Sequence, residues 1–219
     1  YWGASLALSM ADLMLSWHRK VVTVQMRILL LGDSIFARKE GLDQPRINWT
    51  LKEKKPDLEI DNTAVSGINS GALLALLGDL ALKRPRADQL FLMVGVNDAA
   101  SHKQVPLDQY RKNLQAIVSA LVCFYPGTKT VLVSGPAVDE AKQRGRTNAK
   151  LAKYAKVMEE VAAEYQLAYA DFFTAMLKEG DLIALCRGEL DDGLHFGPRG
   201  YQLLAAEMMK QLPKEEVEQ

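Results

Sequence analysis

The chain has 219 residues, of which 48% are hydrophobic and 25% charged, a composition that suits one α/β domain with a substantial core. Lysine plus arginine and aspartate plus glutamate both number 27, so no long-range field favours nucleic acid or an anionic membrane as partner. The two cysteines, Cys123 and Cys186, are too few for a disulfide framework. We expect both to be reduced and Cys123 to lie in the core.

Residues 1–25 are predicted to be an N-terminal extension ahead of the folded domain. The positive charges at 18–20 follow the apolar run at 5–10, whereas in a signal peptide they precede it. The short apolar length and Asp12 argue against a membrane span. We therefore expect no stable membrane insertion and a cytoplasmic location. A dimerisation or surface-docking helix is the alternative for this segment, and the oligomeric state stays open.

From Met26 onward, apolar runs alternate with amphipathic stretches, which is typical of repeated β-α units. Strands are predicted at residues 27–31, 58–64, 89–94, 130–133 and 167–170. One helical stripe of expected core contacts comprises Tyr110, Leu114, Ile117, Val118, Leu121 and Val122. A second comprises Leu151, Tyr154, Met158, Val161, Ala162 and Tyr165. A last helix begins near Pro198, since proline is tolerated in the first turn.

This alternation predicts a single three-layer α/β/α sandwich over residues 26–219. Its sheet is expected to be five-stranded, mostly parallel and flavodoxin-like, with strand order 2-1-3-4-5. In such a sheet the loops after strands 1, 2 and 3 meet at one edge. Residues in those three loops are therefore candidates for one functional site.

The first predicted strand ends in Gly32-Asp33-Ser34. Glycine permits a tight exit from the strand, and Ser34 is expected at a helix N-terminus with its own N–H free. A serine at this place is more often a helix cap than a nucleophile. The tripeptide alone is therefore a weak signal.

Gly67 and Asn97 follow the second and third predicted strands. At Gly67 the backbone can approach a bound oxygen without a side chain between them, although a left-handed turn also explains a glycine. Asn97 carries a neutral N–H donor that suits a developing negative charge. An Asx turn or a helix cap is the alternative for Asn97.

A second source of chemistry is the segment Asp192-Gly193-Leu194-His195. The three-residue spacing lets Asp192 reach the far nitrogen of the His195 ring and fix its tautomer. Asp191 is a competing partner, and a histidine beside a carboxylate is commonly only a satisfied hydrogen-bonding residue. His18 and His102 belong to no motif and are expected to face solvent.

With these blocks in this order, the chain resembles the SGNH (GDSL-type) hydrolase family. The residues of this chain that match the family motifs are Ser34, Gly67, Asn97 and His195. The resemblance covers roughly residues 26–212. Within the family, the chain is similar to the branch that contains isoamyl acetate-hydrolysing esterases. The supporting segments are residues 95–100, 105–110, 136–140 and 192–201.

These residues lead to the hypothesis of serine ester hydrolysis. Ser34 is the expected nucleophile, His195 the general base and Asp192 its orienting carboxylate. The backbone N–H groups of Ser34 and Gly67 and the Asn97 amide are expected to bind the oxyanion. We expect a small-molecule ester as partner and neither a metal nor an organic cofactor. Neighbouring Asp33 and Asp98 are expected to hydrogen-bond loop backbone.

Substrate range is the weaker inference. The apolar residues beside the motifs either line a small pocket for short acyl groups or point into the core; they are Ile35, Phe36, Ile68, Val96, Leu194 and Phe196. A carbohydrate O-deacetylase, lysophospholipase or thioesterase would use the same chemistry.

From another class, a non-catalytic flavodoxin-like protein that binds flavin or a nucleotide explains the alternation equally well. It gains no support from a glycine-rich nucleotide motif, because neither G-x-G-x-x-G nor G-x-x-x-x-G-K-[ST] occurs. The basic cluster of Lys142, Arg144 and Arg146 is expected to be a solvated face.

Overall fold

The computed structural model describes residues 25–213. Apart from Gln25, the extension predicted for residues 1–25 lies outside the described residues. His18 also lies outside them. The predictions for them stay predictions.

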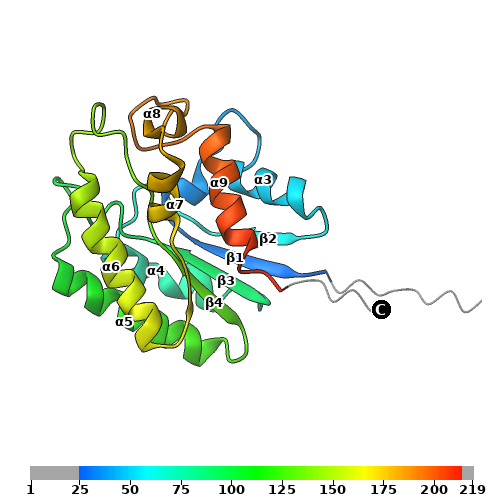
Figure 1. The fold of residues 1–219 in the computed structure, drawn as a ribbon. Helices are drawn as coiled ribbons and strands as arrows, with labels where there is room; N and C mark the ends of the chain where they lie inside the picture. Colours follow the sequence, from blue (N-terminus) through cyan, green and yellow to red (C-terminus); the bar gives the residue numbers. More distant parts are fainter. Residues whose placement is uncertain (1–24, 214–219) are drawn as a thin grey trace, which may run out of the picture.

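Five parallel strands form one sheet in the order β2-β1-β3-β4-β5, which confirms the predicted topology (Figure 1). The strands are β1 Arg27–Gly32, β2 Glu59–Asn62, β3 Gln89–Met93, β4 Lys129–Val133 and β5 Ala168–Ala170. β2 is shorter than the predicted 58–64. The chain nevertheless stays against β1 beyond Asn62, because the N–H groups of Thr63 and Val65 donate to Leu30 and Gly32 at 3.0 and 2.9 Å.

Helices cover both faces of the sheet (Figure 1). They are α2 Ser34–Ala37, α3 Arg46–Lys54, α4 Ser70–Leu77 with the π-helical turn η1 Gly78–Leu82, α5 Leu107–Phe124, α6 Asn148–Glu164, α7 Phe172–Glu179, α8 Leu182–Leu185 and α9 Pro198–Met209. Helix α5 packs between α4 and α6 on one face, and α9 packs against α3 and α7 on the other. The predicted three-layer architecture is confirmed.

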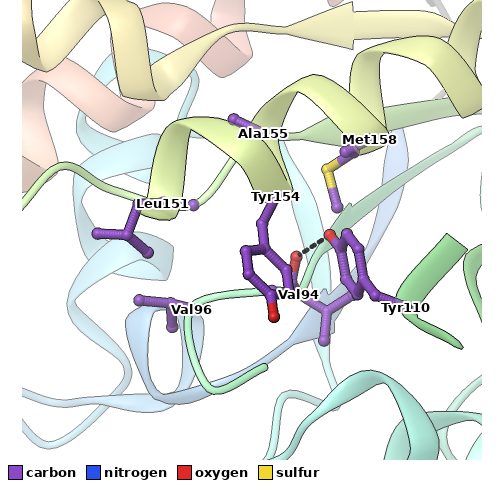
Figure 2. Close-up of a pocket in the computed structure, with 9 residues that line it drawn as sticks. Val94, Val96, Tyr110, Leu151, Tyr154, Ala155 and Met158 are labelled. Atoms are coloured by element: carbon purple, nitrogen blue, oxygen red, sulfur yellow. Dashed lines mark hydrogen bonds between the residues drawn. The ribbon is translucent and has the colours of Figure 1, made fainter. Parts of the chain in front are cut away.

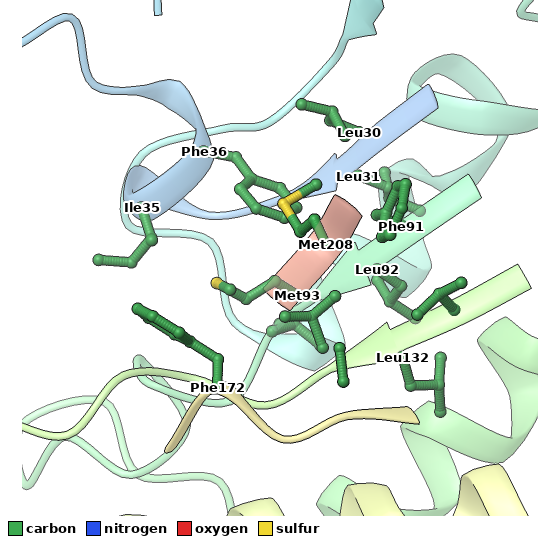
Figure 3. Packing of buried hydrophobic residues seen from close by; sticks show 14 of the residues in the cluster. Leu30, Leu31, Ile35, Phe36, Phe91, Leu92, Met93, Leu132, Phe172 and Met208 are labelled. Atoms are coloured by element: carbon green, nitrogen blue, oxygen red, sulfur yellow. The ribbon is translucent and has the colours of Figure 1, made fainter. Parts of the chain in front are cut away.

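The core fills the space between the sheet and both helical layers. Figure 3 shows part of it, including Leu30 of β1, its neighbour Phe91 of β3 and Met208 of α9. Parallel strands covered on both faces become continuous apolar runs, which explains why β1 was readable from sequence.

Two expectations about α5 are wrong. Val122 is 41% exposed and Cys123 is exposed, although Leu121 is fully buried. Because each helical residue is rotated by about 100° from the last, Val122 falls at the margin of the apolar stripe and Cys123 beyond it. Both cysteines are free, and Cys186 is buried.

Candidate active site

Ser34 stands at the carboxyl end of β1, as the first residue of α2. The N-cap is Asp33, whose Oδ1 accepts the Ile35 N–H at 2.9 Å. The cap alternative for Ser34 is therefore wrong, and its hydroxyl is left for another role. Burial raises the pKa of Asp33 to about 7. Its backbone contact is the structural role that the sequence predicted.

The Ser34 hydroxyl lies 2.8 Å from His195 Nε2, and His195 Nδ1 lies 2.8 Å from Asp192 Oδ2. The first of these hydrogen bonds joins residues 161 positions apart in the chain, and the second joins residues only three positions apart. Asp192 Oδ1 also accepts the backbone N–H groups of Leu194 and His195, at 3.0 and 2.9 Å. Asp191, the competing partner, is exposed and binds the Lys142 ammonium instead.

The charges of this pair are set by burial and hydrogen bonding. Burial lowers the pKa of His195 below its ordinary value, against the opposing effect of Asp192. For Asp192, burial acts to raise the pKa, but the hydrogen bonds from His195 and Leu194 outweigh it, so the net shift is downward. An ionised carboxylate only accepts, so Nδ1 of the neutral ring carries the proton. His195 Nε2 is then free to accept the proton of the Ser34 hydroxyl.

Gly67 lies in the loop between β2 and α4. Its φ of +79° is in the left-handed region, as the turn interpretation predicted. The Lys103 ammonium donates to Gly67 O at 3.3 Å, and a Cβ at residue 67 would lie 3.2 Å from Lys103 Nζ. A side chain here would be strained and would crowd Lys103, so the position is suited to glycine.

Asn97 is 4% exposed and connects the loop after β3 with the loop after β2. Its Nδ2 donates to Ile68 O at 2.9 Å, and its Oδ1 accepts from Arg146 Nη2 at 3.2 Å. The side chain therefore bonds across the site, neither as an Asx turn nor as a helix cap. Asp98 joins the loop after β3 to the first residue of α4, because its Oδ1 accepts the Ser70 N–H at 3.0 Å.

The apolar residues beside the motifs take the core alternative. They are exposed by 4% or less: Ile35, Phe36, Ile68, Val96, Leu194 and Phe196. Val96 lines a cavity of about 10 Å³ with Leu151 and Tyr154 of α6 (Figure 2). Ile35 belongs to the core shown in Figure 3. Almost none of their surface is therefore accessible to a substrate.

Sequence reasoning missed Glu40, which supports the segment that carries His195. Glu40 is 8% exposed, has a left-handed φ of 45° and forms a salt bridge with Arg38. Its Oε2 accepts the N–H of Glu189 at 2.7 Å, and the adjacent Gly188 N–H donates to His195 O at 3.1 Å. The sequence holds no local signal for this role, since a glutamate in a loop is ordinarily solvated.

Arg146 is the second residue whose role the sequence did not indicate. It was expected on a solvated face with Lys142 and Arg144, which are exposed, but Arg146 itself is 8% exposed. His102 faces solvent as expected.

Within residues 25–213 there is no group of three or more His, Cys, Asp or Glu side chains that could hold a metal ion. No helix of that part of the chain is long and apolar enough to cross a membrane.

The sequence model described as the GDSL-like Lipase/Acylhydrolase family matches residues 30–203, which include Ser34, Gly67, Asn97 and His195. The chain belongs to this family. The resemblance found from the motif blocks is confirmed, and so, at the level of the family, is the enzyme class of carboxylic ester hydrolase.

Curated relatives include a GDSL esterase/lipase of Arabidopsis thaliana, 32% identical over 139 residues. That match covers 55% of this chain and 56% of the relative, so it spans about half of the relative's length. The isoamyl acetate-hydrolyzing esterase of Saccharomyces cerevisiae is 25% identical over 205 residues, with 84% of each chain covered.

Solved structures share the fold. A lipase/acylhydrolase from Enterococcus faecalis has a TM-score of 0.74 at 24% identity, covering 87% of this chain and 99% of the other. An acetylxylan esterase from Geobacillus stearothermophilus has a TM-score of 0.68 at 21% identity, covering 87% and 95%. At these identities, the likeness speaks for the α/β architecture alone.

Proposed function

We propose that this protein hydrolyses short-chain carboxylic esters through a covalent acyl-enzyme on Ser34. The observation that carries the proposal is the continuous hydrogen-bonded chain from the Ser34 hydroxyl through the His195 ring to Asp192, with both contacts at 2.8 Å. A hydroxyl, an imidazole and a carboxylate in this order are what nucleophilic acyl transfer requires.

In the first half-reaction, Ser34 Oγ attacks the ester carbonyl carbon while His195 Nε2 takes the hydroxyl proton. Asp192 stabilises the imidazolium that forms, because its carboxylate already binds Nδ1. The tetrahedral intermediate then breaks its bond to the alcohol oxygen, and Nε2 returns the proton to that oxygen. Water repeats the sequence on the acyl-enzyme and releases the acid. None of these steps draws on a metal or an organic cofactor.

The negative oxygen of the intermediate would be bound by the N–H groups of Ser34 and Gly67 and by the Asn97 amide. These residues follow β1, β2 and β3, which are neighbours in the sheet. Asn97 Nδ2 carries two hydrogens, of which Ile68 O takes one. The second remains for a bound oxygen, at a neutral group that does not titrate with pH.

Little apolar surface is exposed near the motif residues, so a substrate with a short acyl group fits better than one with a long chain. The expected pocket residues are buried, whereas Val65 and Leu190 are 37% and 53% exposed, two positions before Gly67 and Asp192. The names of the yeast esterase and the Geobacillus esterase both refer to acetate esters. We therefore propose acetate esters of simple alcohols as substrates, with acetylated carbohydrate as the second candidate.

The test is a panel of acetate, butyrate and octanoate p-nitrophenyl esters and an acetylated xylo-oligosaccharide. We expect acetate and butyrate to be hydrolysed faster than octanoate, and Ser34→Ala to lose about 10⁶-fold in kcat. Ser66→Ala, a change at an exposed serine in the loop after β2, is the matched control and should keep full activity.

Preferred hydrolysis of the carbohydrate ester would favour the deacetylase, and preferred hydrolysis of octanoate would contradict the short-chain assignment. An inactive wild-type protein with the visible absorption of a bound flavin would support the non-catalytic flavodoxin-like alternative. Ser34→Ala hydrolysing at the wild-type rate would refute the serine mechanism.

A further inference from the structure

Arg146 is a buried cation that has no role in the proposed mechanism. It lies in the loop between β4 and α6, with 8% of its surface exposed. Its Nε donates to Val96 O at 2.7 Å, its Nη2 to Asn97 Oδ1 at 3.2 Å and its Nη1 to Gln143 Oε1 at 3.2 Å. Within the described residues, no carboxylate forms a salt bridge with it.

Burying a guanidinium without a directly paired carboxylate is costly. Three fixed bonds to neutral acceptors offset part of that cost, and they fix the guanidinium plane. Two of the three acceptors belong to Val96 and Asn97, which are consecutive residues of the loop after β3. The cation is thus aimed at the residue proposed as the side-chain donor to the oxyanion.

The contact with Arg146 determines which way the Asn97 amide points. Guanidinium nitrogens only donate, so the amide oxygen must face Arg146 and the amide nitrogen must face Ile68 O, 2.9 Å away. With one hydrogen on Ile68, the direction of the second N–H is fixed. A hydrogen bond from a cation also polarises the amide, which strengthens that N–H as a donor.

The same loop contacts the other half of the site. Gln143 accepts from Arg146 through Oε1 and donates through Nε2 to Asp192 O at 3.1 Å. The N–H of Asp139 donates to Gly193 O at 2.8 Å. One loop thus touches both the oxyanion amide and the backbone of the residue that orients His195.

We propose that Arg146 is a positioning residue, which holds the Asn97 amide in the orientation that stabilises the oxyanion and connects it through Gln143 to the Asp192 segment. This inference rests on the proposed function, because Asn97 must be an oxyanion donor. A residue that merely anchors a loop would affect stability and substrate binding. Arg146 instead acts on kcat, and chiefly through the Asn97 amide, to which it bonds directly.

The experiment compares Arg146→Met, Arg146→Lys and the matched control Arg144→Met, which removes an exposed arginine two positions away in the same loop. Arg146→Met should lower kcat on the best short ester by about 10- to 100-fold, with KM changed by less than about threefold. Arg146→Lys keeps a charged donor and should restore part of the loss. Arg144→Met should stay within about twofold of wild type.

A double-mutant cycle with Asn97→Ala supplies the readout that a structural role would not move. In the Asn97→Ala background, Arg146→Met should cost less than about threefold more in kcat, because the group it acts through is gone. Full multiplication of the two losses, or an unchanged kcat in Arg146→Met alone, would overturn the proposal.

Asparagine-selective ¹⁵N labelling tests the contact without catalysis. The Asn97 side-chain amide signals should shift and lose protection from solvent exchange in Arg146→Lys, but not in Arg144→Met. Arg146→Lys keeps this test available if Arg146→Met does not fold. A wild-type protein that hydrolyses no ester would refute the proposed function. With an active wild type, Asn97 signals unchanged in Arg146→Lys would refute the role of Arg146 alone.

Discussion

The nucleophile and the general base of the proposed mechanism are held in two different ways. Ser34 follows a strand buried on both faces, and the Asp33 cap fixes its backbone within two residues. His195 lies between α8 and α9 in a segment without regular secondary structure. That segment is fixed by distant residues: Asp139 binds Gly193, and Glu40 binds Glu189.

The difference teaches that the end of β1 and the local Asp33 cap place the nucleophile, whereas contacts between distant segments must place the base. Side-chain removal at Ser34 or His195 should stop the chemistry in either region. Milder changes should separate the two regions, because the His195 segment has no regular secondary structure and depends on the carboxylates of Asp192 and Glu40 and on contacts from other loops.

The largest effect is expected for His195→Ala. It removes the group that takes and returns the proton, so kcat should fall by about 10⁶-fold if the three residues act as a unit. Steady-state kinetics on a short ester measure this loss. His102→Ala, at an exposed histidine outside the motifs, is the control and should be neutral. A loss of less than tenfold in His195→Ala would break the comparison, since the loop would then carry no general base.

Asp192→Asn should come next, with a loss of about 10⁴-fold in kcat. The amide can still accept the N–H groups of Leu194 and His195, but it no longer offers a negative charge to the ring. The matched change Asp191→Asn removes a neighbouring exposed carboxylate and should leave kcat within about twofold. Equal losses in the two variants would show that the loop responds to general charge and not to the contact with His195.

Asn97→Ala probes the sheet-edge region and should cost about 10²–10³ in kcat, the scale of one oxyanion donor. Asn113→Ala is the control, because that buried amide binds Ser70 Oγ at 2.9 Å without reaching the motif residues. Thermal unfolding of both variants separates lost stability from lost chemistry. A decrease of less than about tenfold would reduce Asn97 to a structural link between two loops.

The smallest effect is the pH dependence of kcat/KM. Because burial lowers the pKa of His195, the ring stays neutral at pH values where an ordinary histidine is already protonated. Activity should therefore fall on the acid side with an apparent pKa below 6.5, and it should be flat around neutrality. Asp33→Asn is the control, since the pKa of Asp33 is about 7. If the loss of activity at acid pH disappeared in Asp33→Asn, the pH dependence of kcat/KM would belong to Asp33 and not to His195.

The strands were predictable because each is a short local run, and the four motif positions were predictable because each belongs to a short block that resembles the family pattern. The sheet order was inferred from the alternation of strands and helices, which is typical of doubly wound sheets. β1 and β3 are apolar runs, and the 2-1-3-4-5 order brings their ends together. The distinction between Asp191 and Asp192 was not predictable from spacing alone. It depends on the left-handed φ of 46° at Asp191 and on Lys142, which lies 49 residues away in the chain.

The buried charges were not predictable for the same reason. Glu40 and Arg146 sit in polar loops that read as solvated, and each is buried by segments distant in sequence. The apolar neighbours of the motifs were equally ambiguous, because a hydrophobic residue beside a site suits both a pocket and a core. Only packing against α6 decides the case of Val96.

The central claim, that Ser34 is a nucleophile activated from a distant loop, is tested most directly by covalent labelling with a serine-directed phosphonate. Peptide mapping by mass spectrometry should find one adduct, on Ser34, in the wild-type protein and slow or no labelling in His195→Ala. Labelling of Ser34 at the same rate in both proteins, or an adduct elsewhere that abolishes activity, would contradict the account.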